Sequence, residues 1–167
     1  MTRCLITAVI LIGVLHAGSR AEAQTAFDTC SLISAEEMGT LIGAKVRKPR
    51  PRTTTRMGVV SYVCTYRSVE DGWTVGVHVE KGRTPEDVRL YVKAFKSVAA
   101  ANAPRAVAGL GDEAFFAPVN PTNGILHVTQ GTDVIWIQTY GKAPGAGSLE
   151  KTKAVAERVM ARLGKGK

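Results

Sequence analysis

Pairs of alternating apolar segments, separated by only a few residues, constrain the fold of this chain more than any other feature. One pair comprises residues 125–130 and 134–140, and the other comprises residues 59–66 and 73–80. Alternation of this kind is typical of strands with one buried face, and such short connections require antiparallel pairing. Residues 134–137 are apolar at every position, which predicts a central strand covered on both faces.

Three helices with capping residues are predicted before, between and after these strand pairs in the sequence. Ser34 and Glu37 form a capping box that begins a helix ending near residue 42, Thr84 precedes a proline-initiated helix at about residues 85–101, and Ser148 begins a helix over residues 149–163. We expect a further strand at residues 113–117 and a proline-containing loop at residues 118–124. The sequence therefore predicts a single α+β domain over residues 24–164. It would hold one antiparallel sheet of about 5–6 strands with helices packed against it, and a disordered tail at residues 165–167.

Residues 1–23 have the three regions of a cleavable secretory signal peptide. Arg3 precedes an apolar run of about a dozen residues, and Ala21 and Ala23 give the small-x-small pattern of the peptidase site. The run is shorter than the ~20 apolar residues of a membrane-spanning helix. A lipid anchor would need a cysteine directly after the cut, whereas the next one is Cys30. We therefore expect a bacterial protein that is periplasmic or secreted, cleaved after Ala23 and without a transmembrane segment in the mature chain.

Cleavage would leave a basic chain of ordinary domain size. The formal charge is +8 for 167 residues, and removal of residues 1–23 lowers it to +7 over 144 residues. A basic protein is attracted to anionic surfaces. Outside the cytoplasm these are phospholipid head groups, lipopolysaccharide, wall polymers or acidic proteins. Since export separates the chain from nucleic acid, we expect no nucleic-acid partner.

Cleavage would also discard Cys4 and leave Cys30 and Cys64 as an even pair. In an oxidising compartment such a pair indicates a disulfide, and closing a loop of about 35 residues would stabilise the fold by roughly 3–4 kcal/mol. A metal pair would need two more soft ligands, for which His78 and His127 remain. A redox-active pair usually lies close in sequence. The structural bridge is favoured, with these two alternatives open.

Positive charge is concentrated between residues 47 and 56. This segment contains two prolines and the five basic residues Arg47, Lys48, Arg50, Arg52 and Arg56. The prolines keep it extended, so we expect a loop or an exposed sheet edge. Because each basic residue near an anionic membrane contributes about 1 kcal/mol, the segment is our candidate contact for an anionic surface or an acidic protein. The competing interpretation is a solvated loop without a partner.

No catalytic motif stands out in the chain. His78 and His127 lie in alternating strands, without a nucleophile elbow or a metal-binding helix around them. The glycines at residues 109–111 lack the rest of a phosphate-binding loop, and Asp112 and Glu113 bring negative charge to the place of the phosphate. We expect instead a tight turn with positive φ, in which Asp112 accepts hydrogen bonds from turn amides.

These patterns predict a non-enzymatic binding or envelope-accessory domain with no catalytic residues, no cofactor and no metal. Two alternatives stay open. One is an envelope hydrolase that uses His78 or His127, and the other is a small secreted enzyme inhibitor.

Three short motifs together resemble a group of exported bacterial domains of unknown function that is common among lipoproteins. They are the opening Asp28-Thr29-Cys30-Ser31-Leu32 before the capped helix, Val63-Cys64-Thr65-Tyr66, and Gly109-Leu110-Gly111-Asp112-Glu113-Ala114. The resemblance implies an α+β fold and a disulfide from the segment before the first helix to the first strand pair. It implies no activity. The chain lacks the anchoring cysteine of many members, so membrane tethering does not follow from it.

Overall fold

The structure is a computed structural model that describes residues 27–56, 59–70, 72–81, 84–142 and 148–164. The expected signal peptide at residues 1–23 and the expected tail at residues 165–167 lie outside the described residues. The strands are β1 (Arg50–Arg56), β2 (Val59–Arg67), β3 (Thr74–Glu80), β4 (Arg105–Ala106), β5 (Glu113–Asn120), β6 (Asn123–Gln130) and β7 (Asp133–Tyr140). The helices are α1 (Ala35–Ile42), α2 (Pro85–Ala99) and α3 (Leu149–Leu163), with 3-10 turns at Thr29–Ser31 and Ala100–Asn102.

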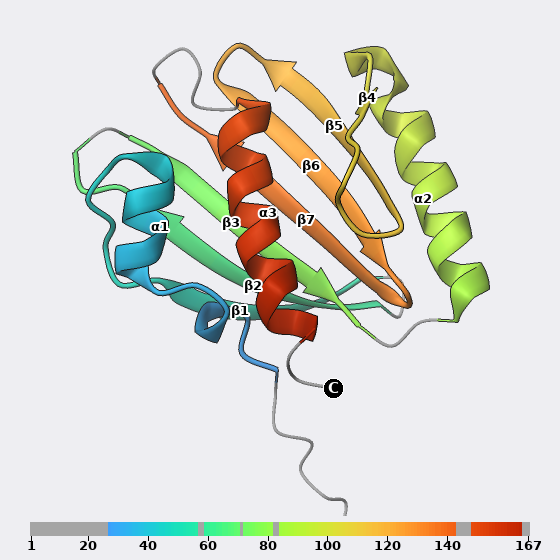
Figure 1. The fold of residues 1–167 in the computed structure, drawn as a ribbon, viewed down its shortest axis with the longest axis horizontal. Helices are drawn as coiled ribbons and strands as arrows, with labels where there is room; N and C mark the ends of the chain where they lie inside the picture. The colour runs from blue at the N-terminus through green and yellow to red at the C-terminus, as the bar shows by residue number, and fades with distance from the viewer. Residues whose placement is uncertain (1–26, 57–58, 71, 82–83, 143–147, 165–167) are drawn as a thin grey trace, which may run out of the picture.

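The seven strands form one antiparallel sheet in the order β1-β2-β3-β7-β6-β5-β4 (Figure 1). This confirms the predicted α+β class with one antiparallel sheet, which is larger than the expected 5–6 strands by the edge strand β1 and the two-residue β4. Strand β7 pairs with β3 on one side and with β6 on the other, so the apolar run at its start does lie in the centre of the sheet.

The helix boundaries follow the predicted caps. The hydroxyl of Ser34 accepts from the Glu37 N–H while the Glu37 carboxylate accepts from the Ser34 N–H, and Thr84 and Asp87 form the same reciprocal box at α2. Helix α1 ends at Gly43, which has φ +74°. In the described part of the chain, no helix has both the length and the apolar character needed to cross a membrane.

Helices α1 and α3 lie across one face of the sheet, which we call the α3 face (Figure 1). The main core fills the space between them and the sheet, and Met38, Val77, Leu126, Ile137 and Val155 are completely buried there. The predicted buried face of the 73–80 strand, formed by Trp73 and the valines at 75, 77 and 79, belongs to this core. Most of the apolar burial of the fold is therefore on the α3 face.

The opposite face, which we call the α2 face, carries a second and smaller cluster. Val88 and Val92 of α2 pack there against Phe115 of β5 and Val134 of β7, with Phe95 partly buried beside them. Phe115 and Phe116 are consecutive residues of one strand and belong to different clusters, as expected when side chains alternate across a sheet. Helix α2 is thus held by far fewer buried residues than α3.

The expectation of a loop at residues 118–124 is wrong. Strand β5 continues to Asn120, a turn occupies residues 121–122, and β6 begins at Asn123. The register shifts between Pro118 and Asn120, so the proline sits at an irregularity rather than ending the strand. Proline lacks the N–H of a regular ladder, and the shift accommodates that loss.

Candidate functional site

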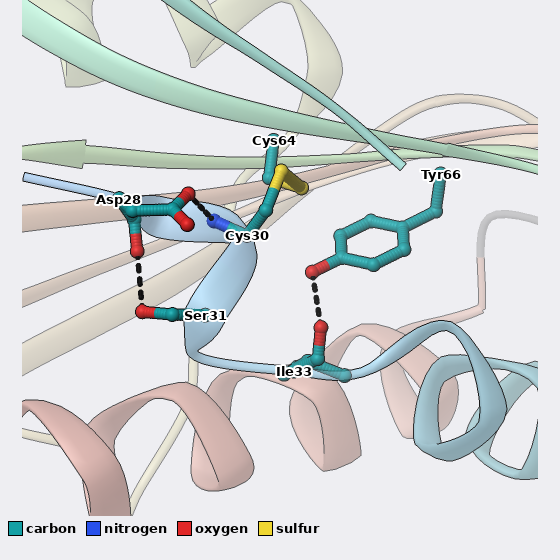
Figure 2. The surroundings of a disulfide bond; sticks show 6 residues. All are labelled: Asp28, Cys30, Ser31, Ile33, Cys64 and Tyr66. Carbon is teal, nitrogen blue, oxygen red and sulfur yellow. Dashed lines mark hydrogen bonds between the residues drawn. A yellow bond between two sulfur atoms is a disulfide. The ribbon is translucent and has the colours of Figure 1, made fainter. Parts of the chain in front are cut away.

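The Cys30–Cys64 pair forms the disulfide that the sequence favoured (Figure 2). Cys30 belongs to the turn before α1, where its N–H donates to the Asp28 carboxylate at 2.9 Å. Cys64 is completely buried on β2, on the α3 face. The metal-pair alternative for these cysteines therefore gives way to a bridge between the N-terminal turn and the sheet.

A buried hydrogen bond reinforces this connection. The Tyr66 hydroxyl donates to the Ile33 carbonyl oxygen at 2.7 Å, two residues along β2 from the bridge (Figure 2). Burial raises the pKa of Tyr66, so the phenol remains protonated and keeps its donor at neutral pH. Together the bridge and the hydrogen bond fix the start of α1 over β2.

The basic segment is an edge strand and not a loop. Arg50 and Arg52 lie on β1, which pairs along its length with β2, and Arg56 ends β1. Arg47 and Lys48 precede the strand and are exposed. The Arg47 N–H donates to the Arg67 carbonyl oxygen at 2.9 Å, which continues the contact with β2. Of the two structural expectations for this segment, the exposed sheet edge is confirmed.

The register places three arginines on the α2 face of the sheet edge. Arg52 opposes Val63, which in turn opposes His78, so its side chain shares the face of that histidine. Arg50 lies two residues away on the same face, and Arg67 of β2 joins it on the neighbouring strand. The side chains of Arg50, Arg52 and Arg67 are exposed, and we call them the arginine edge. Sequence reasoning missed Arg67 because it lies outside the basic run and is brought in only by the strand register.

The two histidines lie on either side of Trp136 on the α2 face. His78, Trp136 and His127 occupy successive strands of one cross-strand row. The ring centroids of His78 and Trp136 are 4.3 Å apart, and those of Trp136 and His127 are 5.5 Å apart. Phe115 stacks on His127 at 5.2 Å, and Phe95 of α2 covers it at 3.4 Å. The sequence did not indicate this cluster, because its members come from five separate elements.

Both imidazoles are held neutral by burial. Desolvation lowers the pKa of His127 to about 3, with a smaller contribution from the nearby His78. Desolvation likewise lowers the pKa of His78 to about 4. His127 is buried, with only 1% of its surface exposed, yet within the described ranges its Nε2 has no hydrogen-bond partner. His127 is therefore a buried polar group in an aromatic environment, which costs stability.

A hydroxyl and a carboxylate lie next to this row, on Ser61 and Glu80. These residues oppose each other on β2 and β3, one step along the same face from His78. Both are almost completely buried, with exposures of 7% and 5%. Both side chains of this pair are therefore largely shielded from solvent in the structure.

A groove of about 550 Å³ lies between α2 and the turn regions that flank β5 and β6. Val88 and Val92 contribute its apolar lining, and Arg89, Lys93 and Lys96 form the α2 side. Asp112 and Glu113 lie on the opposite side, where Glu113 forms an ion pair with Lys96. We call this depression the α2 groove.

The glycine-containing turn at residues 109–112 ends at Asp112, which lines the α2 groove on the side opposite α2. Gly109 and Gly111 have positive φ, as predicted. The Asp112 carboxylate accepts from the Gly131 N–H at 2.6 Å, so its partner is a turn amide of the β6–β7 hairpin rather than of its own turn. The Asp112 N–H also donates to the Thr129 carbonyl oxygen at 2.8 Å. Two hydrogen bonds therefore fix this turn against the end of the β6–β7 hairpin.

A search of the described residues finds no group of three or more histidine, cysteine, aspartate or glutamate side chains that could hold a metal ion. No protein-family model matches the chain, and comparisons with curated proteins and with solved structures also give no match. The resemblance to exported bacterial domains therefore remains a hypothesis.

Proposed function

We propose that the mature chain is a non-enzymatic, exported binding domain, periplasmic or secreted, that contacts an anionic surface of the cell envelope through the arginine edge. The observation that carries the proposal is the display of Arg50, Arg52 and Arg67, all exposed, on one face of the edge strand β1 and its neighbour β2. The preferred anionic surface is a phospholipid membrane, whose head groups present many negative charges in one plane.

The spacing of the three arginines suits such a plane. Residues two apart on one strand are about 7 Å apart, and neighbouring strands are about 4.8 Å apart. Arg67 lies two residues beyond the partner of Arg50 and four beyond the partner of Arg52, so the three Cα atoms fall within about 15 Å of one another. Lys48 and Arg47, exposed just before β1, extend the positive charge along the same edge. The guanidinium group donates to phosphate oxygens through a planar fork, which makes arginine well suited to this contact.

The expected strength is modest and depends on salt. At about 1 kcal/mol for each basic residue, the three arginines would supply roughly 3 kcal/mol of binding free energy. The Debye length falls from about 10 Å at 0.1 M salt to about 3 Å at 1 M, so most of this attraction should be lost at high salt. The edge thus supports a reversible peripheral contact.

The fold offers indirect support for this location. A disulfide that closes on a buried strand residue fits an oxidising compartment, as a periplasmic or secreted protein requires. The buried surroundings of His78 and His127 favour a binding role over a histidine-dependent hydrolase. An enzyme-inhibitor role would use a protein partner, and the same edge could contact an acidic protein.

Vesicle binding tests the proposal. The protein beginning at Gln24 would be mixed with phosphatidylglycerol vesicles and with phosphatidylcholine vesicles, at 50 mM and 500 mM NaCl, and bound protein measured by sedimentation. We expect binding to the anionic vesicles at low salt and its loss at high salt. Equal binding to both lipids, or no binding to either, would contradict the proposal, and the second outcome would direct attention to an acidic protein partner.

A further inference from the structure

We propose that the α2 groove is a binding site for a small amphiphilic anion, a molecule with a carboxylate or phosphate head and a short apolar tail. This inference goes beyond the proposed function, because the α2 groove borders β5 and β6, whereas the arginine edge belongs to β1 and β2, near the opposite edge of the same face of the sheet. The two sites would use different residues and different ligands.

The size and floor of the α2 groove suit an apolar tail. Its volume of about 550 Å³ is within the range of small-molecule sites, which is roughly 300–1,000 Å³. Val88 and Val92 are each 6% exposed and line the α2 groove. Pro85 adds apolar surface at the start of α2. These valines belong to the second cluster, so an apolar ligand group would extend an existing packed surface.

The charges favour an anionic head. Arg89, Lys93 and Lys96 follow one another at spacings of four and three residues, which places them along one side of α2. Three cations and two carboxylates line the α2 groove, giving it a net positive charge. Because the cations are in excess, a cationic ligand would be repelled at the α2 side.

Both carboxylates already have partners within the protein. Glu113 forms an ion pair with Lys96, and Asp112 accepts from the Gly131 N–H. Lys96 is further engaged over the ring of Phe115, at 5.4 Å from its centroid. Because Lys96 is already engaged, Arg89 and Lys93 are the lining cations that an incoming head group would contact.

The wall opposite α2 is preformed. Gly111 has φ +54°, and a Cβ atom at this position would lie 2.2 Å from the Thr129 carbonyl oxygen, so only glycine allows the turn to approach β6 this closely. The Asp112 hydrogen bonds then hold the turn in place. A preformed wall reduces the ordering that a ligand would have to induce.

Calorimetry and NMR with defined probes test this site. Octanoate and octyl phosphate would be titrated into the folded protein below their micelle concentrations, with acetate and inorganic phosphate as head-only probes and octanol as a tail-only probe. We expect at least one of the eight-carbon anions to bind at least tenfold more tightly than its own head group and than octanol. The amide shifts should centre on Lys93, Thr129 and Gly131.

Matched charge variants complete the test. Arg89→Gln with Lys93→Gln should weaken binding of that anion at least tenfold, whereas Arg50→Gln with Arg52→Gln removes the same charge and should leave it unchanged. The proposal is overturned if neither eight-carbon anion binds at millimolar concentration, if the head-only probes bind equally well, or if the shifts centre elsewhere. Since the control pair lies on the arginine edge, failure of this site is distinguishable from failure of the vesicle contact.

Discussion

Acidification should destabilise the fold through His127, which is buried, and His78, which is partly buried. The folded protein holds His127 and His78 neutral, with pKa values lowered to about 3 and about 4. In the unfolded chain each imidazole returns to a pKa of about 6.5 and binds a proton as the pH falls. Because the unfolded state then binds more protons than the folded state, stability decreases with decreasing pH from about 6.5 down to the folded pKa values.

The size of the effect follows from these pKa values. At pH 5 an unfolded imidazole is almost fully protonated, and this proton binding stabilises the unfolded state by about 2 kcal/mol. Folded His127 binds almost no proton at this pH, so the folded state gains almost nothing. His78 contributes a similar amount, so the two together should lower the free energy of unfolding by about 4 kcal/mol between pH 7.5 and pH 5. That loss is a large fraction of the roughly 5–15 kcal/mol typical of a domain.

Urea unfolding of the protein beginning at Gln24, followed by tryptophan fluorescence and circular dichroism at pH 7.5, 6 and 5, measures this change. His127→Phe keeps a ring in the aromatic cluster and removes the titrating nitrogen, so it should remove about half of the pH dependence. His78→Gln should remove a similar share. A wild-type free energy of unfolding that is constant from pH 7.5 to 5, or a His127→Phe variant with the full dependence, would refute the reasoning.

Three other perturbations test the framework of the fold. Replacing both Cys30 and Cys64 by serine should lower the melting temperature by about 10 °C or more, since the bridge closes a loop worth roughly 3–4 kcal/mol; equal melting of oxidised and reduced protein would contradict this. Gly111→Ala should cost about 2 kcal/mol or more in urea unfolding because its Cβ meets β6, whereas Gly109→Ala, with φ +79° and open space around it, should cost about 1 kcal/mol. Glu37→Gln should lower the melting temperature by a few degrees because the carboxylate joins α1 to Arg158 and Arg162 of α3; the control Glu157→Gln, in an exposed pair with Lys153, should change it by about 1 °C or less.

Local signals in the sequence predicted much of the fold. The reciprocal caps at Ser34 and Thr84 mark helix starts that need no distant partner, and the β6–β7 hairpin follows from alternation around a short turn. The disulfide followed from cysteine number and compartment. Each of these features depends on residues close in sequence or on a simple count.

The features that the sequence did not predict depend on residues far apart in the chain. Strand β1 contains arginine, threonine and Pro51 and has no apolar alternation, so its strand conformation comes from pairing with β2 rather than from its own composition. Pro118 indicated a loop, but the register shift next to it lets the strand continue. The same reason applies to the candidate sites: Arg67 joins the arginine edge only through the β1–β2 register, and the α2 groove exists only where α2 approaches the turn after Gly111.

Partition of charge variants onto phosphatidylglycerol vesicles at 50 mM NaCl tests the central claim most directly. The variant Arg50→Gln, Arg52→Gln and Arg67→Gln removes the arginine edge. A control with Lys81→Gln, Arg105→Gln and Lys153→Gln removes the same charge from the end of β3, from β4 and from α3. If the edge makes the contact, the first variant should bind about 100-fold more weakly and the control should stay within about threefold of the wild type. Equal weakening of the two variants would show that net charge, and not the arginine edge, drives the binding.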